Sequence, residues 1–178
     1  MPNSVNKLKV GGLFSGIGGV ELGFKKVGFE IAWANEFDKN ACITYRTNFP
    51  NHLLIEKDIW EIIDNDFMYE NKELSEIDIL VGGFPCQAFS VAGYRKGFDD
   101  ERGNLFFAIV EFITHFKPKA ILLENVKNLE GHDNGKTFGR IFSELDSLGY
   151  SVIHKVLNTS MYTDIPQTRE RIFVVCFR

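Results

Sequence analysis

The stretch Ile79–Ser90, with the sequence ILVGGFPCQAFS, places the strongest constraint on how this chain can fold. Its opening apolar run predicts a buried parallel strand, because a strand covered on both faces carries apolar residues without alternation. Gly82 and Gly83 then end the strand, and Pro85 stiffens the backbone that leads into Cys86. Reacting groups in open α/β sheets gather at the carboxyl ends of strands, which makes Cys86 a candidate nucleophile.

The competing interpretation is that Cys86 is a core residue, since most free cysteines are small buried hydrophobes. The chain has three cysteines, Cys42, Cys86 and Cys176, and no C-x-x-C pair. This pattern argues against a disulfide framework and against a metal site of the zinc type. Cys42 falls in a helical pattern and Cys176 in an apolar strand, so both are predicted to belong to the core.

The composition fits one globular domain that covers residues 1–178, with 44% hydrophobic and 25% charged residues. The amino end, Met1–Lys9, is polar, and no apolar run approaches the length of a membrane span, so we expect a cytoplasmic protein without a membrane partner. A net charge of −4 is unusual for an autonomous nucleic-acid binder. Either the partner is small, or the basic surface lies elsewhere.

A strand, a glycine-rich turn and a helix are predicted near the amino end. Leu8–Phe14 has the pattern of a strand, and Ser15–Gly19 (SGIGG) that of the turn. Such a turn lets the backbone approach a ligand, and the amides at the helix start favour a polar or anionic group. The helix is expected over Val20–Val27, with one apolar face made of Val20, Phe24 and Val27.

An acidic residue follows the second predicted strand, Phe29–Asn35. Glu36 stands where α/β nucleotide-binding units hydrogen-bond a ribose, so Gly16, Gly18 and Glu36 together suggest a cofactor that contains adenosine. The fingerprint is imperfect, because Glu21 occupies the place of the third glycine. A surface glutamate after a strand is the alternative interpretation of Glu36.

The remaining pattern predicts an α/β protein with a mostly parallel, doubly wound sheet. The last two strands follow each other without a helix, which indicates an antiparallel strand at one edge. The expected helices are Lys39–Asn48 with Asp38 as its cap, Leu105–Phe116, and Phe138–Leu148; the expected strands are His52–Ile55, Ile77–Val81, Ala120–Leu123, Ser151–Leu157 and Arg171–Phe177.

A second set of polar residues is expected at the same sheet edge as Cys86. The strand that begins at Ala120 leads into Glu124, Asn125 and Val126. A carboxyl group at such an edge, beside apolar walls, is suited to act as an acid, whereas a helix-capping or surface pair is the alternative. The loop after Cys86 has the glycines and basic residues of an active-site loop, although composition alone does not separate it from a plain solvated loop.

Taken together and in this order, the motifs FPCQAFS, ENV and QTRER resemble those of the bacterial C5-cytosine DNA methyltransferases of restriction-modification systems. The LFSGIGG turn, Asn35–Glu36 and Lys57–Ile59 resemble the first three motifs of that family. The resemblance covers nearly the whole chain. It implies a Rossmann-like S-adenosylmethionine-dependent methyltransferase fold and S-adenosyl-L-methionine as cofactor. The cofactor-binding residues that it implies are Phe14, Gly16, Gly18, Gly19, Glu36, Phe37, Asp58, Ile59, Pro85 and Leu105.

The resemblance also implies a catalytic set. Cys86 would attack carbon 6 of a cytosine flipped out of double-stranded DNA, which turns carbon 5 into a nucleophile for the methyl group. Glu124 would hold and protonate ring N3, and Asn125 would help to orient it. Arg169 and Arg171 would anchor the base and the DNA backbone.

Two departures from the family pattern bear on function. Gly12 stands where the family usually has an aspartate, which is expected to loosen the methionine end of the cofactor site. The resemblance also stops at the QTRER motif, before the target-recognition region and the last two motifs. We therefore expect the catalytic and cofactor part of the enzyme, which depends on a second polypeptide or a carboxyl-terminal region for target recognition.

Other functions remain open at this point. An RNA cytosine methyltransferase would use the same chemistry, and a non-catalytic nucleotide-binding module would retain the cofactor turn without using Cys86. A nicotinamide dehydrogenase has the least support, because Glu21 interrupts the fingerprint and no hydride-transfer histidine is evident.

Overall fold

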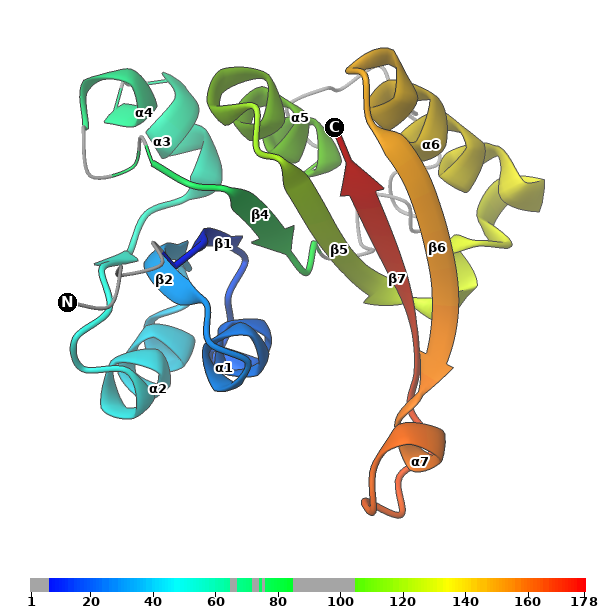
Figure 1. Ribbon diagram of the computed structural model, residues 1–178, viewed down its shortest axis with the longest axis horizontal. Helices are drawn as coiled ribbons and strands as arrows, with labels where there is room; N and C mark the ends of the chain where they lie inside the picture. Colours follow the sequence, from blue (N-terminus) through cyan, green and yellow to red (C-terminus); the bar gives the residue numbers. More distant parts are fainter. Residues whose placement is uncertain (1–6, 65–66, 72–73, 75, 85–104) are drawn as a thin grey trace, which may run out of the picture. The chain divides into compact units, whose positions relative to one another are not determined.

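The computed structural model of the chain describes residues 7–64, 67–71, 74, 76–84 and 105–178. The chain forms two compact units, Met1–Val81 and Gly82–Arg178. Figure 1 shows helices and strands alternating through the first unit, and a pair of long strands near the end of the second. The mixed α/β class predicted from the sequence is confirmed.

The first unit is built on strands in the order β3-β2-β1-β4. β1 pairs with β2, and β2 with β3, in parallel. α1 and α2 lie beside each other on one side of β1 and β2 (Figure 1). The strands are β1 (Lys9–Leu13), β2 (Glu30–Asn35), β3 (Leu54–Ile55) and β4 (Ile79–Gly82); the helices are α1 (Gly19–Lys26), α2 (Lys39–Asn48), α3 (Ile59–Asp64) and α4 (Phe67–Glu70).

Several local predictions for the first unit are confirmed. Asp38 caps α2, because its Oδ1 accepts a hydrogen bond of 2.8 Å from the amide of Ala41. Cys42 is buried, as predicted. The third strand is shorter than the predicted His52–Ile55, since only Leu54 and Ile55 pair with β2.

Trp33 explains why β1 contains a glycine at its centre. The indole of Trp33 is fully buried and its Nε1 donates a hydrogen bond of 3.2 Å to the carbonyl of Leu74. Gly11 pairs with Trp33 in the β1–β2 register. A Cβ atom added at Gly11 would lie 2.7 Å from both Cε2 and Cη2 of that ring, which is closer than non-bonded carbons approach.

We therefore expect Gly11→Ala to destabilise the protein by about 1–3 kcal/mol, the usual effect of overpacking a filled core. Gly23→Ala is the matched control, because Gly23 lies within α1 and has no neighbour within 4 Å of an added Cβ. That change should instead stabilise the helix by roughly 0.5–1 kcal/mol. Urea denaturation measures both, and a Gly11→Ala protein as stable as the parent would contradict the packing described.

The buried face of α1 differs from the prediction. Val27 is 73% exposed, because the helix ends at Lys26 and Val27 is its carboxyl-terminal cap. The buried residue of α1 is instead Glu21, which is 1% exposed. An acidic side chain outside the predicted apolar face thus faces inward.

The second unit has three strands in the order β5-β7-β6. β7 runs antiparallel to both neighbours, which confirms the antiparallel arrangement of the last two predicted strands. Its elements are α5 (Leu105–Phe116), β5 (Ala120–Val126), the 3-10 turns η5 (Lys127–Leu129) and η6 (His132–Gly135), α6 (Lys136–Ser147), β6 (Ser151–Asn158), α7 (Thr159–Tyr162) and β7 (Glu170–Phe177). The short helix α7 lies at the tip of the β6–β7 pair (Figure 1).

β5 is longer than predicted and therefore includes the polar residues at its end. Glu124 pairs with Phe173, and Asn125 with Ile172, so both residues lie within the strand rather than beyond it. The core of this unit contains Phe106, Ala108, Ile109, Phe112 and Ile113 of α5 and the fully buried Cys176. Burial raises the pKa of the Cys176 thiol to about 12, as expected for a core cysteine.

Within the described part of the chain, none of the helices combines the length and the hydropathy that a membrane span requires.

Candidate active site

The glycine-rich turn between β1 and α1 uses its glycines in two different ways. Gly16 has a φ of +55°, and neither Gly16 nor Gly19 has an atom within 4 Å of an added Cβ, so their backbone borders open space. Gly18 is buried, and an added Cβ would overlap Cε2 of the Phe49 ring and would lie 2.9 Å from its Cδ2 and 3.0 Å from Cε2 of Tyr45. Gly18 is therefore required for packing against α2, whereas Gly16 and Gly19 leave room for a ligand.

Glu36 ties this turn to the end of β2. Its Oε2 accepts a hydrogen bond of 2.8 Å from the amide of Gly16, and its Oε1 accepts from the amides of Phe37 at 2.8 Å and Asp38 at 2.9 Å. A carboxylate has about four acceptor positions, so Glu36 retains capacity for a sugar hydroxyl. The neighbouring Phe37 ring is 66% exposed and offers a flat apolar face.

Asn35 joins the ends of β2 and β3, a role that the predicted site set does not include. Its Nδ2 donates to the carbonyls of Ile55 at 3.0 Å and Lys57 at 2.8 Å. These bonds hold the chain just before Asp58, whose Oδ1 accepts from the amide of Trp60 at 2.8 Å. A polar residue at the end of an apolar strand was the available sequence signal for this role.

Two other predicted cofactor-binding residues of the first unit have less open surroundings. Ile59 begins α3 and is buried among core residues. Phe14 is half-buried and has a φ of +54°, which turns the chain from β1 into the glycine-rich segment.

Buried polar atoms without partners gather in the same segments. Among the described residues, Ser15 Oγ, Glu21 Oε2 and Trp60 Nε1 are buried and make no hydrogen bond. Native proteins leave few such atoms unpaired, and each one calls for an explanation such as a ligand or water. Ser15 lies on the turn, Glu21 in the first turn of α1 that follows it, and Trp60 two residues after Asp58, so the residues present suit a polar, adenosine-containing group.

Glu124 and Arg171 form an ion pair in the second unit. Arg171 Nε lies 3.0 Å from Glu124 Oε1, and both side chains are only partly accessible. Arg171 also donates to the carbonyl of Glu170 at 2.8 Å, which restrains the guanidinium. The other oxygen of Glu124 faces Gly83, where an added Cβ would lie 3.5 Å from it. The carboxyl of Glu124 is thereby oriented at the end of β5.

Asn125 fixes the backbone that leads to the predicted nucleophile. Its Nδ2 donates a hydrogen bond of 3.0 Å to the carbonyl of Phe84, and its Oδ1 accepts from the amide of Val126 at 2.8 Å. Asn125 is 3% exposed, and Phe84 packs against Phe106 with a ring separation of 5.9 Å. The anchored carbonyl thus belongs to the second residue before Cys86 in the sequence.

The remaining predicted site residues of this unit are Pro85, Cys86, Leu105 and Arg169. Pro85 and Cys86 lie outside the described residues. Leu105 is the first residue of α5 and is half-buried. Arg169 has an exposed side chain, and its carbonyl accepts a hydrogen bond of 3.0 Å from the amide of Thr159. Of the two predicted arginines, Arg171 is the one that contacts Glu124.

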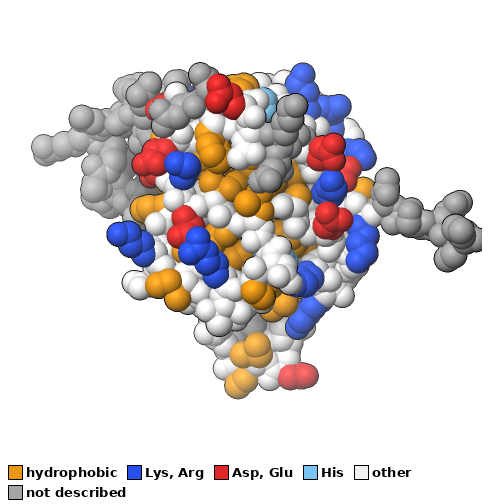
Figure 2. Space-filling model, turned by 90° about the vertical axis from the view of Figure 1, so that its left-hand side faces the viewer, with side chains coloured by type: hydrophobic (Ala, Val, Ile, Leu, Met, Phe, Trp, Pro, Cys, Tyr) orange, Lys and Arg blue, Asp and Glu red, His pale blue; other side chains and the backbone are white. Residues whose placement is uncertain are grey.

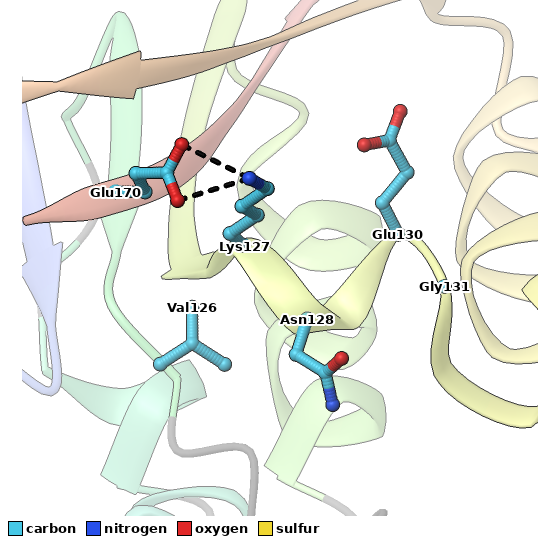
Figure 3. A pocket seen from close by; sticks show the side chains of 6 residues that line it. All are labelled: Val126, Lys127, Asn128, Glu130, Gly131 and Glu170. Carbon is cyan, nitrogen blue, oxygen red and sulfur yellow. Dashed lines mark hydrogen bonds and ion pairs between the residues drawn. The ribbon is translucent and has the colours of Figure 1, made fainter.

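A shallow pocket lies beyond the end of β5 (Figure 3). Lys127 reaches from the end of that strand to Glu170 on β7, with contacts of 2.9 and 3.0 Å to the two carboxylate oxygens. The pocket has a volume of about 510 Å³ and borders the strand that carries Glu124 and Asn125. Its lining residues are Val126, Lys127, Asn128, Glu130, Gly131 and Glu170.

On the face shown in Figure 2, acidic and basic side chains of the described residues are mixed. Among the described residues, no group of three or more His, Cys, Asp or Glu side chains is placed to hold a metal ion.

Comparison with known proteins connects these features. The C-5 cytosine-specific DNA methylase family model matches residues 8–178. Type II methyltransferase M.Bsp6I of Bacillus sp. (strain RFL6) is 51% identical over 96% of this chain and 52% of its own length. Type II methyltransferase M.HaeII of Haemophilus aegyptius is 48% identical over 93% of this chain and 49% of its own length. The chain thus spans about half the length of these curated relatives.

Solved structures are similar as well. The Dnmt2 methyltransferase of S. pombe has a TM-score of 0.74 at 26% identity, over 96% of this chain and 51% of that one. A DNMT2 mutant of Spodoptera frugiperda has a TM-score of 0.75 at 26% identity, over 97% and 50%. The Rossmann-like methyltransferase fold expected from the resemblance is therefore confirmed. Because the family model matches residues 8–178, nearly the whole of this chain, the chain belongs to the C-5 cytosine-specific DNA methylase family.

Proposed function

We propose that residues 1–178 form the catalytic and cofactor-binding domain of a DNA (cytosine-5-)-methyltransferase. The observation that carries this proposal is the arrangement at the end of β5. Glu124 is oriented by Arg171, and Asn125 holds the carbonyl of Phe84 just before Cys86 in the chain. An oriented carboxyl, together with an anchored backbone carbonyl two residues before a cysteine in the sequence, suits covalent catalysis assisted by an acid.

Each residue of this set has one chemical role in the proposed reaction. The Cys86 thiolate forms a bond to carbon 6 of cytosine while Glu124 delivers a proton to ring N3. Carbon 5 then takes up the methyl group and gives up its proton to water. The bond between Cys86 and carbon 6 breaks and N3 returns its proton to Glu124, which releases 5-methylcytosine. Asn125 holds the carbonyl of Phe84 and helps to orient Glu124, whereas Arg169 and Arg171 contact the base and the DNA backbone. The target cytosine must leave the base stack, because carbon 6 is shielded in the duplex.

S-adenosyl-L-methionine is the proposed cofactor and would supply an electrophilic methyl group. Glu36 would bind the ribose hydroxyls through its remaining acceptor positions. Gly16 and Gly19 would give the backbone close access to the methionine part. The full set of proposed cofactor-binding residues is Phe14, Gly16, Gly18, Gly19, Glu36, Phe37, Asp58, Ile59, Pro85 and Leu105.

Double-stranded DNA is the proposed substrate, and the cytoplasm is the proposed location. The relatives have about twice the length of this chain. We propose that target recognition depends on residues outside it, either in the same polypeptide or in a second one.

An RNA substrate has less support than DNA. The family model and the most similar relatives carry DNA methylase or Type II methyltransferase names. Transfer of methyl groups to tRNA in preference to duplex DNA would reverse this choice. A non-catalytic module would bind the cofactor, but its properties would not depend on Cys86 or Glu124.

Cofactor binding is the first test. We expect calorimetric titration of S-adenosyl-L-methionine into the chain to give a single site, and Glu36→Ala to weaken it by about 10-fold or more, because a carboxylate hydrogen bond is typically worth ~1.5–3 kcal/mol. Glu30→Ala is the matched control, since Glu30 is an exposed carboxylate at the other end of β2. Thermal unfolding of each variant checks that the turn held by Glu36 remains folded. A parent chain without affinity would contradict the proposed cofactor site.

A further inference from the structure

Glu21 is a buried acidic residue whose surroundings leave it incompletely paired. It lies in the first turn of α1 and is 1% exposed, and its Oε2 makes no hydrogen bond among the described residues. None of the ion pairs within the described part of the chain includes it. Burial raises the pKa of this carboxyl, and the negative charge of Glu36 adds to the shift.

The carboxyl of Glu21 lies over the backbone of β1 at Gly12. A Cβ atom added at Gly12 would overlap Glu21 Oε1 and would lie 2.8 Å from Ser15 Oγ. Two side-chain oxygens therefore converge on the Cα of Gly12, where the strand enters the glycine-rich turn. The Ser15 hydroxyl lies beside this carboxyl and opposes the rise in the pKa of Glu21, while Glu21 Oε2 keeps no partner among the described residues.

The helix dipole offsets only part of the cost of burying the Glu21 carboxylate. A carboxylate in the first turn of a helix is favoured by the helix dipole, by about 0.3–1 kcal/mol at exposed sites. Burial of an incompletely paired charge costs more than that, and a nearby cationic hydrogen-bond donor is the partner that would offset the cost. The position thus suits a ligand with a positively charged N–H group.

We propose that Glu21, with the Ser15 hydroxyl, positions the methionine part of the cofactor by accepting a hydrogen bond from its α-ammonium group. This inference rests on the proposed function, because it takes S-adenosyl-L-methionine as the ligand of the turn. Glu36 at the end of β2 is the proposed ligand of the ribose, so the carboxyl of Glu21, which lies over Gly12 of β1, is left for the other end of the cofactor. In the methionine part of the cofactor, the α-ammonium is the group that carries a positive charge and also donates hydrogen bonds.

Positions 12 on β1 and 21 on α1 are then alternative places in the chain from which one side-chain carboxylate could reach the ligand. A side chain at Gly12 is excluded while Glu21 occupies the space. Shortening Glu21 to alanine frees this space, provided that the Ser15 hydroxyl, 2.8 Å from the added Cβ, rotates away. An aspartate at Gly12 could then present a carboxylate from β1 instead of from α1. This exchange is a prediction that a purely structural role of Glu21 does not make.

The test compares two ligands that differ by one group. S-adenosylhomocysteine has the α-ammonium, and its deamino analogue carries hydrogen there. By calorimetry we expect the parent chain to prefer S-adenosylhomocysteine by about 10-fold or more, as for a charge-assisted hydrogen bond. Glu21→Gln should reduce this preference to about 2-fold or less, with little change in affinity for the analogue. Equal weakening of both ligands, or an unchanged preference, would overturn the inference.

The folding of the variant is checked by thermal unfolding at pH 7. A carboxyl whose pKa is raised on folding contributes stability that is complete below its ordinary pKa of 4.5 and is lost as the pH rises through its raised value. Glu21→Gln is therefore expected to keep or raise Tm at pH 7 while it loses the ligand preference. The double variant Gly12→Asp/Glu21→Ala should recover that preference relative to Glu21→Ala alone, and a failure to recover it would count against the shared carboxyl position.

The two proposals fail in different ways. A parent chain that binds neither ligand overturns the proposed cofactor function together with this inference. A parent chain that binds both ligands equally well leaves cofactor binding intact and overturns only the role of Glu21.

Discussion

Replacing Cys86 with serine is expected to lower methyl transfer by at least about 10³-fold, because a serine hydroxyl is far less nucleophilic than a thiolate and nucleophile replacements in covalent enzymes have effects of this size or larger. The assay uses a chimera in which this chain replaces the matched half of M.Bsp6I, to which it is 51% identical. Incorporation of labelled methyl groups into duplex DNA that M.Bsp6I methylates measures the rate.

Cys176→Ala is the matched control for the Cys86 variant. Cys176 is also a free cysteine, but it is fully buried in β7 and its thiol has no role in the proposed reaction. Its replacement should change stability and leave the rate of methyl transfer within a few-fold of the parent chimera. A Cys86→Ser chimera with full activity would eliminate the covalent mechanism and favour a non-catalytic role for this loop.

Replacing Glu124 with glutamine is expected to lower methyl transfer by about 10²–10⁴-fold, the typical contribution of a positioned general acid. Glutamine keeps the shape of the side chain but cannot deliver the proton to cytosine N3. It also loses the ion pair of 3.0 Å with Arg171 that orients the group. The same chimera and labelled-methyl assay give the rate, and circular dichroism checks the fold.

Glu170→Gln separates the chemical effect from the loss of an ion pair. Glu170 lies on the same strand as Arg171 and pairs with Lys127 at 2.9 Å, so its replacement removes a comparable contact from the end of β5 (Figure 3). We expect this variant to keep the parent rate within a few-fold, because exposed ion pairs contribute only about 0–1 kcal/mol. Equal losses in the Glu124 and Glu170 variants would show that Glu124 acts through structure rather than through proton transfer.

Local patterns in the sequence predicted most of the elements. The apolar face of α5, the aspartate cap of α2 and the buried strands β1 and β2 depend on neighbours within a few residues, which periodicity and capping rules capture. The predicted ends of the strands were less accurate. The strand expected over Ala120–Leu123 continues to Val126, because pairing with β7 extends β5. That pairing joins residues about 50 positions apart, beyond the reach of local patterns.

Motif order was the strongest source of functional information. The residues FPCQAFS, ENV and QTRER point to one chemistry because each supplies a group that the same reaction needs. The pairing of Glu124 with Arg171, rather than Arg169, depends on the strand register, in which Val126 faces Arg171. The bond from Asn125 to the carbonyl of Phe84 likewise joins segments 41 residues apart.

The sequence by itself determined the α/β class, the succession of strands and helices, and the candidate residues of the reaction, because these depend on local spacing and on the chemistry of each side chain. Only the tertiary structure decided what each polar group faces. It separated Gly18, which packs against Tyr45, from Gly16, which borders open space, and it buried Glu21 over Gly12. Burial and partners arise from contacts between distant segments, so an acidic residue with the spacing of a surface position became the candidate ligand of an ammonium group.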